Sequence, residues 1–153
     1  MDMNGNSELA VPQNTLGAEL RQLENKQWEQ ITLPHTPFVE PLTVLHQWQG
    51  ICYYKKKITI TPEEAKKHIW IEFEGAMHLA DVWINGKHVM QHAGGYTPFV
   101  VDATGLLKTG KENELLVRLD NRNNSLIPPG KPLETLDFCY YCLLYTSDAA
   151  DDM

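Results

Sequence analysis

Residues 73–102 read FEGAMHLADVWINGKHVMQHAGGYTPFVVD, and their pattern indicates a series of short strands. Apolar residues alternate with polar ones at residues 69–74, which lead into this stretch, and a second alternating run covers residues 80–84; this is the period-2 pattern of strands with one buried face. The second run stops at Asn85-Gly86, a pair that tolerates the positive φ angles of a type I′ turn, so it predicts a two-residue hairpin. Gly94-Gly95 breaks the returning strand, and Tyr96-Thr97-Pro98-Phe99 opens the next. The apolar sets are Ile69, Ile71 and Phe73, then Ala80, Val82 and Ile84.

The same kind of punctuation continues outward from this stretch. Between Trp48 and Asn121, glycine-containing turns separate short strand patterns, and this spacing predicts an antiparallel sandwich rather than βαβ units. Thr61-Pro62-Glu63-Glu64 fits a helix N-cap with proline at the first position, which predicts at most one helical turn over residues 62–67. Residues 15–26 carry leucines at helical spacing, and we expect a short amphipathic helix there, anchored to the sandwich by Trp28.

The composition limits which classes of function the chain can have. The 153 residues favour one domain, with 42% hydrophobic and 22% charged residues, as in ordinary globular chains. A net charge of −7 argues against a nucleic-acid partner. No run approaches about 18 apolar residues, so no membrane span is expected. Residues 1–12 lack the charged and apolar regions of a signal peptide, which predicts a cytoplasmic protein, or a periplasmic one if the start is miscalled.

The ordered motifs FEG, VWINGK, H-x-GGY-x-PF and V-x-D resemble the N-terminal sugar-binding domain of glycoside hydrolase family 2, which includes β-galactosidases, β-glucuronidases and β-mannosidases. The resemblance implies an all-β, jelly-roll-like antiparallel β-sandwich of the galactose-binding-domain type over residues 28–141, with residues 1–27 as a lead-in. Flanking segments that share the resemblance are WEQITLPHTPF (28–38), QGICYYKK (49–56), NELLVRLDN (113–121) and LDFCYY (136–141).

The resemblance ends after Tyr141, where the family continues with a Gly-Gly-x-Tyr-Arg-Asp-Val motif. Residues 142–153 instead read CLLYTSDAADDM, which resembles the translation of a transposon-end sequencing adapter. We therefore expect residues 142–153 to be a non-native tail and the sandwich to be incomplete at its C-terminus. The alternative is a natural acidic tail.

Two residues are candidates for substrate binding, and only through the resemblance. In the family, one loop residue before the Pro-Phe of the opening segment and one aspartate shortly before the closing Gly-Gly contribute to the edge of the sugar site. These positions correspond to His35, in PHTPF, and Asp137, in LDFCYY. A carboxylate can accept hydrogen bonds from adjacent sugar hydroxyls. The alternatives are a loop cap for Asp137 and a packed turn residue, held by Pro34 and Pro37, for His35.

Other candidate groups have plainer interpretations. His88 and His92 are four apart, but on a strand that spacing separates them by about 13 Å, so ordinary strand histidines are favoured over a metal site. Cys139 and Cys142 form a C-x-x-C pattern without the other ligands that zinc requires or the helix that redox chemistry requires. Cys52 is expected to be a small buried residue on a strand.

Aromatic and acidic residues could also suggest a sugar site. Trp70 and Trp83 lie in strong strand patterns and are expected to be buried, whereas Trp48 is left open as a stacking platform. The carboxylate pairs at residues 63–64 and at residues 72 and 74 lie on a turn and on an exposed strand face, not in a cleft.

No catalytic residue is expected in this chain. Retaining glycosidases need two carboxylates about 5–5.5 Å apart, and in the family both are glutamates on a downstream (β/α)₈ barrel. The resemblance implies an accessory carbohydrate-binding domain that packs on this barrel and completes its site for terminal non-reducing β-glycosides, galactosides first. It implies no cofactor here, although family enzymes can use Mg²⁺ or Na⁺ elsewhere, and it leaves room for a homo-oligomeric parent. The alternatives are a free-standing lectin-like module and a purely structural sandwich.

Overall fold

The computed structural model describes residues 23, 27–33, 35, 48–127 and 144–145. The chain divides into two units, residues 1–31 and 32–153, which are described separately. Of the helix predicted over residues 15–26, only Leu23 is described, and it is helical. No helix among the described residues is long and apolar enough to cross a membrane.

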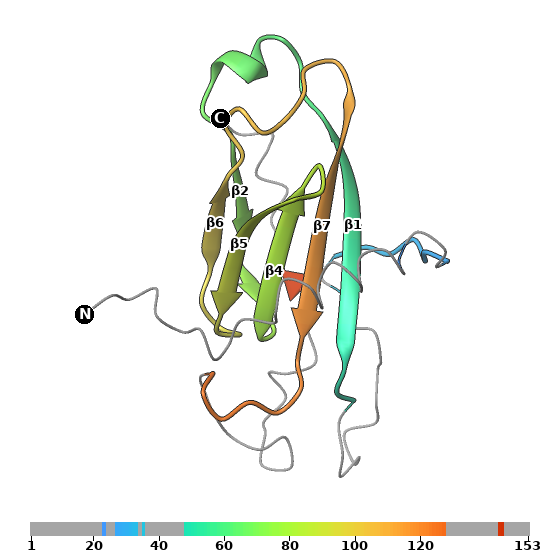
Figure 1. Ribbon diagram of the computed structural model, residues 1–153, viewed down its shortest axis with the longest axis vertical. Coiled ribbons are helices and arrows are strands. Elements are labelled where there is room, and N and C mark those ends of the chain that lie inside the picture. Colours follow the sequence, from blue (N-terminus) through green and yellow to red (C-terminus); the bar gives the residue numbers. More distant parts are fainter. Residues whose placement is uncertain (1–22, 24–26, 34, 36–47, 128–143, 146–153) are drawn as a thin grey trace, which may run out of the picture. The chain divides into compact units, whose positions relative to one another are not determined.

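The second unit is built from antiparallel strands, which confirms the predicted all-β sandwich (Figure 1). One sheet has four strands in the order β1-β7-β4-β5, and β2 pairs with β6 in a second sheet. The only helical turn in the described part of this unit is the 3₁₀ helix η1 (Glu64–Lys66). The strands are β1 (Ile51–Thr59), β2 (Trp70–Phe73), β3 (Gly75–Ala76), β4 (Leu79–Ile84), β5 (Lys87–Ala93), β6 (Phe99–Asp102), β7 (Glu112–Asp120) and β8 (Leu144–Tyr145).

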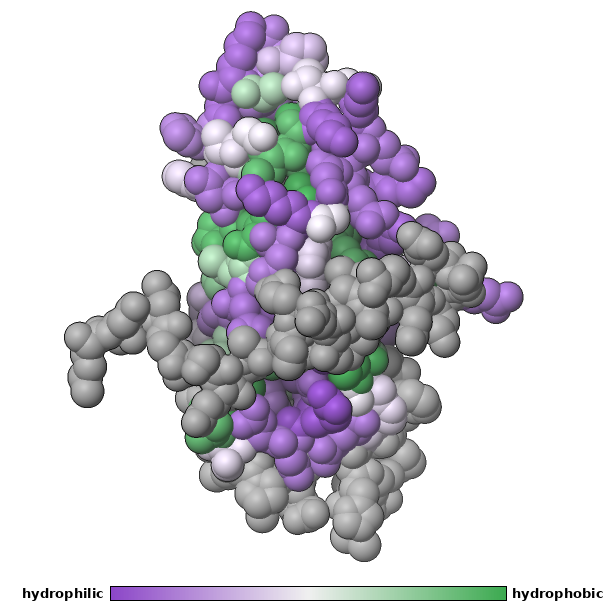
Figure 2. Space-filling model, in the orientation of Figure 1, coloured by the Kyte–Doolittle hydropathy of each residue, from purple (hydrophilic) through white to green (hydrophobic). Residues whose placement is uncertain are grey.

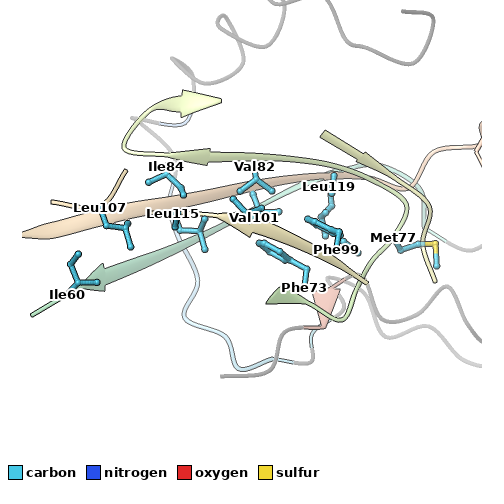
Figure 3. Close-up of a cluster of buried hydrophobic side chains, with 14 residues drawn as sticks. Ile60, Phe73, Met77, Val82, Ile84, Phe99, Val101, Leu107, Leu115 and Leu119 are labelled. Carbon is cyan, nitrogen blue, oxygen red and sulfur yellow. The ribbon is translucent and has the colours of Figure 1, made fainter. Parts of the chain in front are cut away.

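The hydrophobic core lies between the two sheets (Figure 3). Phe73 of β2 and Phe99 of β6 stack with ring centroids 4.6 Å apart. Facing them are alternate residues of β4 and β7, because successive strand side chains point to opposite faces. The predicted alternation is therefore confirmed, and the buried members are Ala80, Val82 and Ile84 on β4, Val101 on β6, and Leu115, Val117 and Leu119 on β7.

The predicted Asn85-Gly86 hairpin joins β4 to β5. Asn85 has φ 50° and Gly86 φ 79°, and Ile84 pairs directly with Lys87, as a type I′ turn requires. The Asn85 side chain also donates to the Leu106 carbonyl (3.1 Å) and to Oδ1 of Asn113 (2.9 Å). This turn is therefore tied to the loop before β7 as well as closed on itself.

Asn113, fully buried at the start of β7, organises that loop. Its Oδ1 accepts the Lys108 backbone N–H at 2.7 Å, and its Nδ2 lies within hydrogen-bonding distance of the carbonyls of Ile58, Lys108 and Lys111. Satisfying all of these groups in a buried position stabilises the loop, because buried polar groups left unpaired are costly.

The helical turn predicted within residues 62–67 is also confirmed, as the 3₁₀ helix η1. The Thr61 hydroxyl accepts the Glu64 backbone N–H (3.2 Å), and the Glu64 carboxylate accepts the Thr61 backbone N–H (2.6 Å). This reciprocal pair is a capping box. Hydrogen bonds to the carboxylate lower the pKa of Glu64.

The burial of the two strand tryptophans differs. Trp83 on β4 is 3% exposed, as expected, but Trp70 on β2 is 55% exposed, so the prediction that it is buried is wrong. The reason is positional: Ile71 and Phe73 occupy the core-facing side of β2, and Trp70 alternates to the other side, where it stacks on His68.

Within residues 142–153, Leu144 and Tyr145 form β8, which pairs antiparallel with Gly75–Ala76 of β3. That residues 142–153 are non-native stays a prediction.

Candidate functional site

Four strand ends of the large sheet lie in one row. Asp120, the last residue of β7, pairs with Ile51 on one side and with Leu79 on the other, and Leu79 pairs with Ala93. The loops that leave this row are here called the rim, comprising residues 48–50, 77–78, 94–98 and 120–127. The rim is at the lower end of the sheet in Figure 1. Loops at one end of a rigid sheet are where binding residues gather.

Asn121 fastens the start of β1 to the end of β7. Its Oδ1 accepts the Gly50 backbone N–H at 2.7 Å, and its Nδ2 donates to the Trp48 carbonyl at 3.0 Å. A Cβ on Gly50 would lie 2.5 Å from the Trp48 ring, so any larger residue would force that indole to move. Two loops distant in sequence are thereby fixed side by side.

Asp120 holds the chain as it leaves β7. Its Oδ1 accepts the backbone N–H and the Nε–H of Arg122 at 3.1 and 2.9 Å, and its Oδ2 lies 2.6 Å from Arg122 Nη2 and 3.3 Å from Arg118 Nη2. Burial alone would raise the pKa of Asp120, but the hydrogen bonds and charge of Arg122 and the charge of Arg118 hold that pKa below its usual value. Asp120 therefore stays ionised at neutral pH.

His78 links this corner to the β5–β6 loop. Its backbone N–H donates to the Asp120 carbonyl (3.2 Å), and its carbonyl accepts the Gly94 N–H (2.8 Å). The ring is buried, 5% exposed as a residue, and burial lowers the pKa of His78 against the opposing charge of Asp120. A neutral imidazole therefore occupies this junction at neutral pH.

The Gly94–Pro98 loop is braced from beneath by His92 of β5. His92 Nε2 lies 3.1 Å from the Gly94 carbonyl and 3.0 Å from the Thr97 hydroxyl. Its ring stacks on Phe99 with centroids 4.3 Å apart. Burial lowers the pKa of His92, which favours the neutral ring. At the tip of this loop Tyr96 is 51% exposed.

His35, the first predicted site residue, is half-buried beside β1. Its Nδ1 lies 3.0 Å from the Tyr54 hydroxyl, and the two rings meet edge to face. Tyr54 pairs with Val117 and packs against the core, so His35 lies on the core-facing side of β1. Asp137, the second predicted site residue, is outside the described residues. Its contribution to sugar binding therefore stays a prediction.

The histidines considered for a metal site lie in β5, as strand residues. His88 Nε2 contacts Asp81 Oδ1 at 2.9 Å, whereas His92 contacts the loop below it. No group of three or more potential metal ligands occurs within the described ranges. Cys52 is half-buried on β1, and burial raises the pKa of its thiol to about 11.

The sequence did not reveal a buried ionic network on the outer face of β4 and β7. Asp81 and Arg118 are 0% and 1% exposed, and Asp81 Oδ2 lies 3.6 Å from Arg118 Nη1. Asp81 also accepts a hydrogen bond from Gln91 Nε2 at 2.9 Å. Alternation placed Asp81 on the polar face of its strand, but only the pairing of β4 with β7 brings Arg118 beside it.

Comparisons with known proteins agree with this architecture. The family described as "Glycosyl hydrolase 2 galactose-binding domain-like" matches residues 19–130. The β-galactosidase of Thermoanaerobacter pseudethanolicus is 32% identical over 124 residues, 79% of this chain and 17% of that protein. The β-glucuronidase of Bacteroides fragilis is 37% identical over 101 residues, 65% of this chain and 14% of that protein.

Solved structures give the same result. A Bacteroides uniformis β-glucuronidase superimposes with a TM-score of 0.64 at 32% identity, over 69% of this chain and 12% of that one. A putative β-galactosidase from Bacteroides fragilis gives 0.65 at 26% identity, over 82% and 18%. The chain thus spans less than a fifth of these relatives, corresponding to their accessory β domain. It belongs to the galactose-binding domain-like family of glycosyl hydrolase 2.

Proposed function

We propose that this chain acts as the N-terminal accessory carbohydrate-binding domain of a family 2 glycoside hydrolase. The family match over residues 19–130 carries the proposal. The rim supports it, because Asp120, Asn121 and His78 hold several loops rigidly at one end of the sheet. A preorganised set of loops loses little conformational freedom when it binds a ligand.

In this proposal the domain packs on a (β/α)₈ barrel that supplies both catalytic glutamates, and it completes the edge of the sugar site. Asp137 accepts hydrogen bonds from sugar hydroxyls, and His35 lines the same edge. The Tyr54 hydroxyl, 3.0 Å from His35 Nδ1, fixes the orientation of that imidazole. The proposed reaction of the complete enzyme is hydrolysis of a terminal non-reducing β-glycoside.

The sugar is proposed to be galactose or glucuronic acid. Both activities occur in the names of relatives with similar identity, such as the Thermoanaerobacter β-galactosidase and the Bacteroides β-glucuronidase. These sugars differ at C6, where glucuronic acid carries a carboxylate, so a cation near the site would favour the glucuronide.

A domain exchange tests the proposal. Residues 19–141 would replace the corresponding domain of the Thermoanaerobacter β-galactosidase, and hydrolysis of nitrophenyl β-galactoside and β-glucuronide would be measured. We expect the exchanged enzyme to hydrolyse at least one of them, and we expect the 153-residue chain alone to hydrolyse neither. A well-folded exchanged enzyme without activity, as judged by circular dichroism and a cooperative melt, would argue for a lectin-like module or a purely structural sandwich.

A further inference from the structure

We infer that Tyr96 is a saccharide-contacting residue at the rim, an inference that rests on the proposed function. Tyr96 lies in the loop between β5, which ends at Ala93, and β6, which begins at Phe99. Ala93 belongs to the row of strand ends that also contains Asp120. Tyr96 and the chain leaving β7 therefore emerge from the same end of the sandwich (Figure 1).

The loop is held by one contact on each side of Tyr96. His92 Nε2 is within hydrogen-bonding distance of the Gly94 carbonyl and the Thr97 hydroxyl, so one imidazole holds the loop both before and after Tyr96. That imidazole stacks on Phe99, which in turn stacks on Phe73 in the core. A column of three rings thus connects the loop to the most buried part of the sandwich.

The inner side of the loop is equally constrained. The Gly94 N–H donates to the His78 carbonyl, and a Cβ on Gly95 would lie 2.3 Å from Met77 Sδ, because the loop packs directly on that buried side chain. His78 is in turn bonded to the Asp120 carbonyl. The loop that carries Tyr96 is therefore connected through His78 to Asp120, the last residue of β7.

Although its loop is held rigidly, the Tyr96 side chain is exposed, with 51% of the residue accessible to solvent. A tyrosine ring offers a large apolar face and a hydroxyl with only two side-chain torsions to restrict, so binding through it costs little conformational entropy. A pyranose matches this chemistry, since its C–H face can stack on the ring and its hydroxyls can bond to the phenol. The ligand class that fits is a neutral or anionic monosaccharide glycoside.

The test is a titration of the ¹⁵N-labelled 153-residue chain with methyl β-galactoside and, separately, methyl β-glucuronide, followed by NMR. Tyr96→Ala should raise the Kd by about threefold to tenfold, as expected for the loss of one stacking contact, and Tyr96→Phe should change it less. Trp70→Ala is the matched control, because Trp70 is similarly exposed but lies on β2, away from the rim. The Kd of this variant for the glycoside should equal that of the wild type.

Equal affinities of the Tyr96→Ala variant and the wild type, together with weakened binding by Asp137→Ala, would overturn the role of Tyr96 and leave the proposed function standing. Absence of wild-type shifts with either glycoside would overturn the inference that this chain carries a saccharide contact at Tyr96. The domain exchange would then decide the proposed function separately, because it measures hydrolysis and not binding by the chain alone.

Discussion

Replacing Asp81 by asparagine should destabilise the protein strongly. The substitution keeps the shape of the side chain but removes the carboxylate charge beside Arg118, which is only 1% exposed. Among the described residues, the nearest anion that this guanidinium would keep is Asp120 at 3.3 Å, which already binds Arg122. Removing one partner of a buried ion pair costs about 3–5 kcal/mol, because the other charge stays buried. Against a typical total of about 5–15 kcal/mol, this loss is large.

Urea unfolding followed by tryptophan fluorescence measures the effect, and the midpoint should fall while the slope is unchanged. Glu114→Gln is the control: its ion pair with Lys55 is short, 2.6 Å, but partly exposed, so the expected loss is below about 1 kcal/mol. Replacing both partners, Asp81→Leu with Arg118→Met, should recover much of the loss. A loss below about 1 kcal/mol for Asp81→Asn would refute the view that the buried Arg118 charge depends on the Asp81 carboxylate.

Three further predictions concern the loops and the rim. Asn113→Ala should lower the free energy of unfolding by at least about 2 kcal/mol, because five hydrogen-bonding contacts of a fully buried amide are lost; an unchanged melting temperature would contradict this. Burial lowers the pKa of His78 below its ordinary 6.5, so its contribution to stability is complete above pH 6.5 and declines as pH falls toward the folded-state pKa. The melting temperature should therefore drop less between pH 7.5 and 5.5 for His78→Gln than for the wild type, and equal drops would show that folding does not lower the pKa of His78. In the exchanged enzyme, Asp137→Ala should cost about 1.5–3 kcal/mol in kcat/KM through loss of a charge-assisted hydrogen bond, and an unchanged kcat/KM would leave Asp137 as a structural cap.

Local patterns predicted the strands well because one rule governs them. Each apolar set that the alternation selected, such as Ala80, Val82 and Ile84, faces the core, and the Asn85-Gly86 turn has the φ angles that its residues favour. Trp70 shows the limit of the same rule. Its residue type favoured burial, but its place in the alternation put it on the outer side of β2, and the alternation prevailed.

Long-range features were beyond the sequence for a different reason. Strand order does not follow chain order, since β7 lies between β1 and β4. The Asp81–Arg118 pair, the Tyr54–His35 contact and the bridge through His78 all depend on that order or on loop packing. The motifs around Gly94-Gly95 indicated a family, yet the support that His92 gives to Tyr96 is visible only when side chains are placed.

In the upper part of the face shown in Figure 2, a strip of hydrophobic residues lies between hydrophilic ones, and in the lower part hydrophilic residues occupy the centre of the described surface. Among the described residues, the exposed large hydrophobic side chains include Trp70 and Val100 on the outer side of the β2–β6 pair, and Tyr96 and Leu126 in loops.

The contacts of Asn85 also bear on how the protein ages. Asparagine followed by glycine is the sequence most prone to spontaneous deamidation, and asparagine is a thermolabile residue. Here the Asn85 amide nitrogen donates to the Leu106 carbonyl and to Asn113 Oδ1, which restrains the side chain. Conversion to aspartate would replace that donor with a negatively charged oxygen facing two acceptors. Deamidation of Asn85 would thus loosen the loop before β7. The shelf life of the purified domain should therefore depend on whether this one amide stays intact.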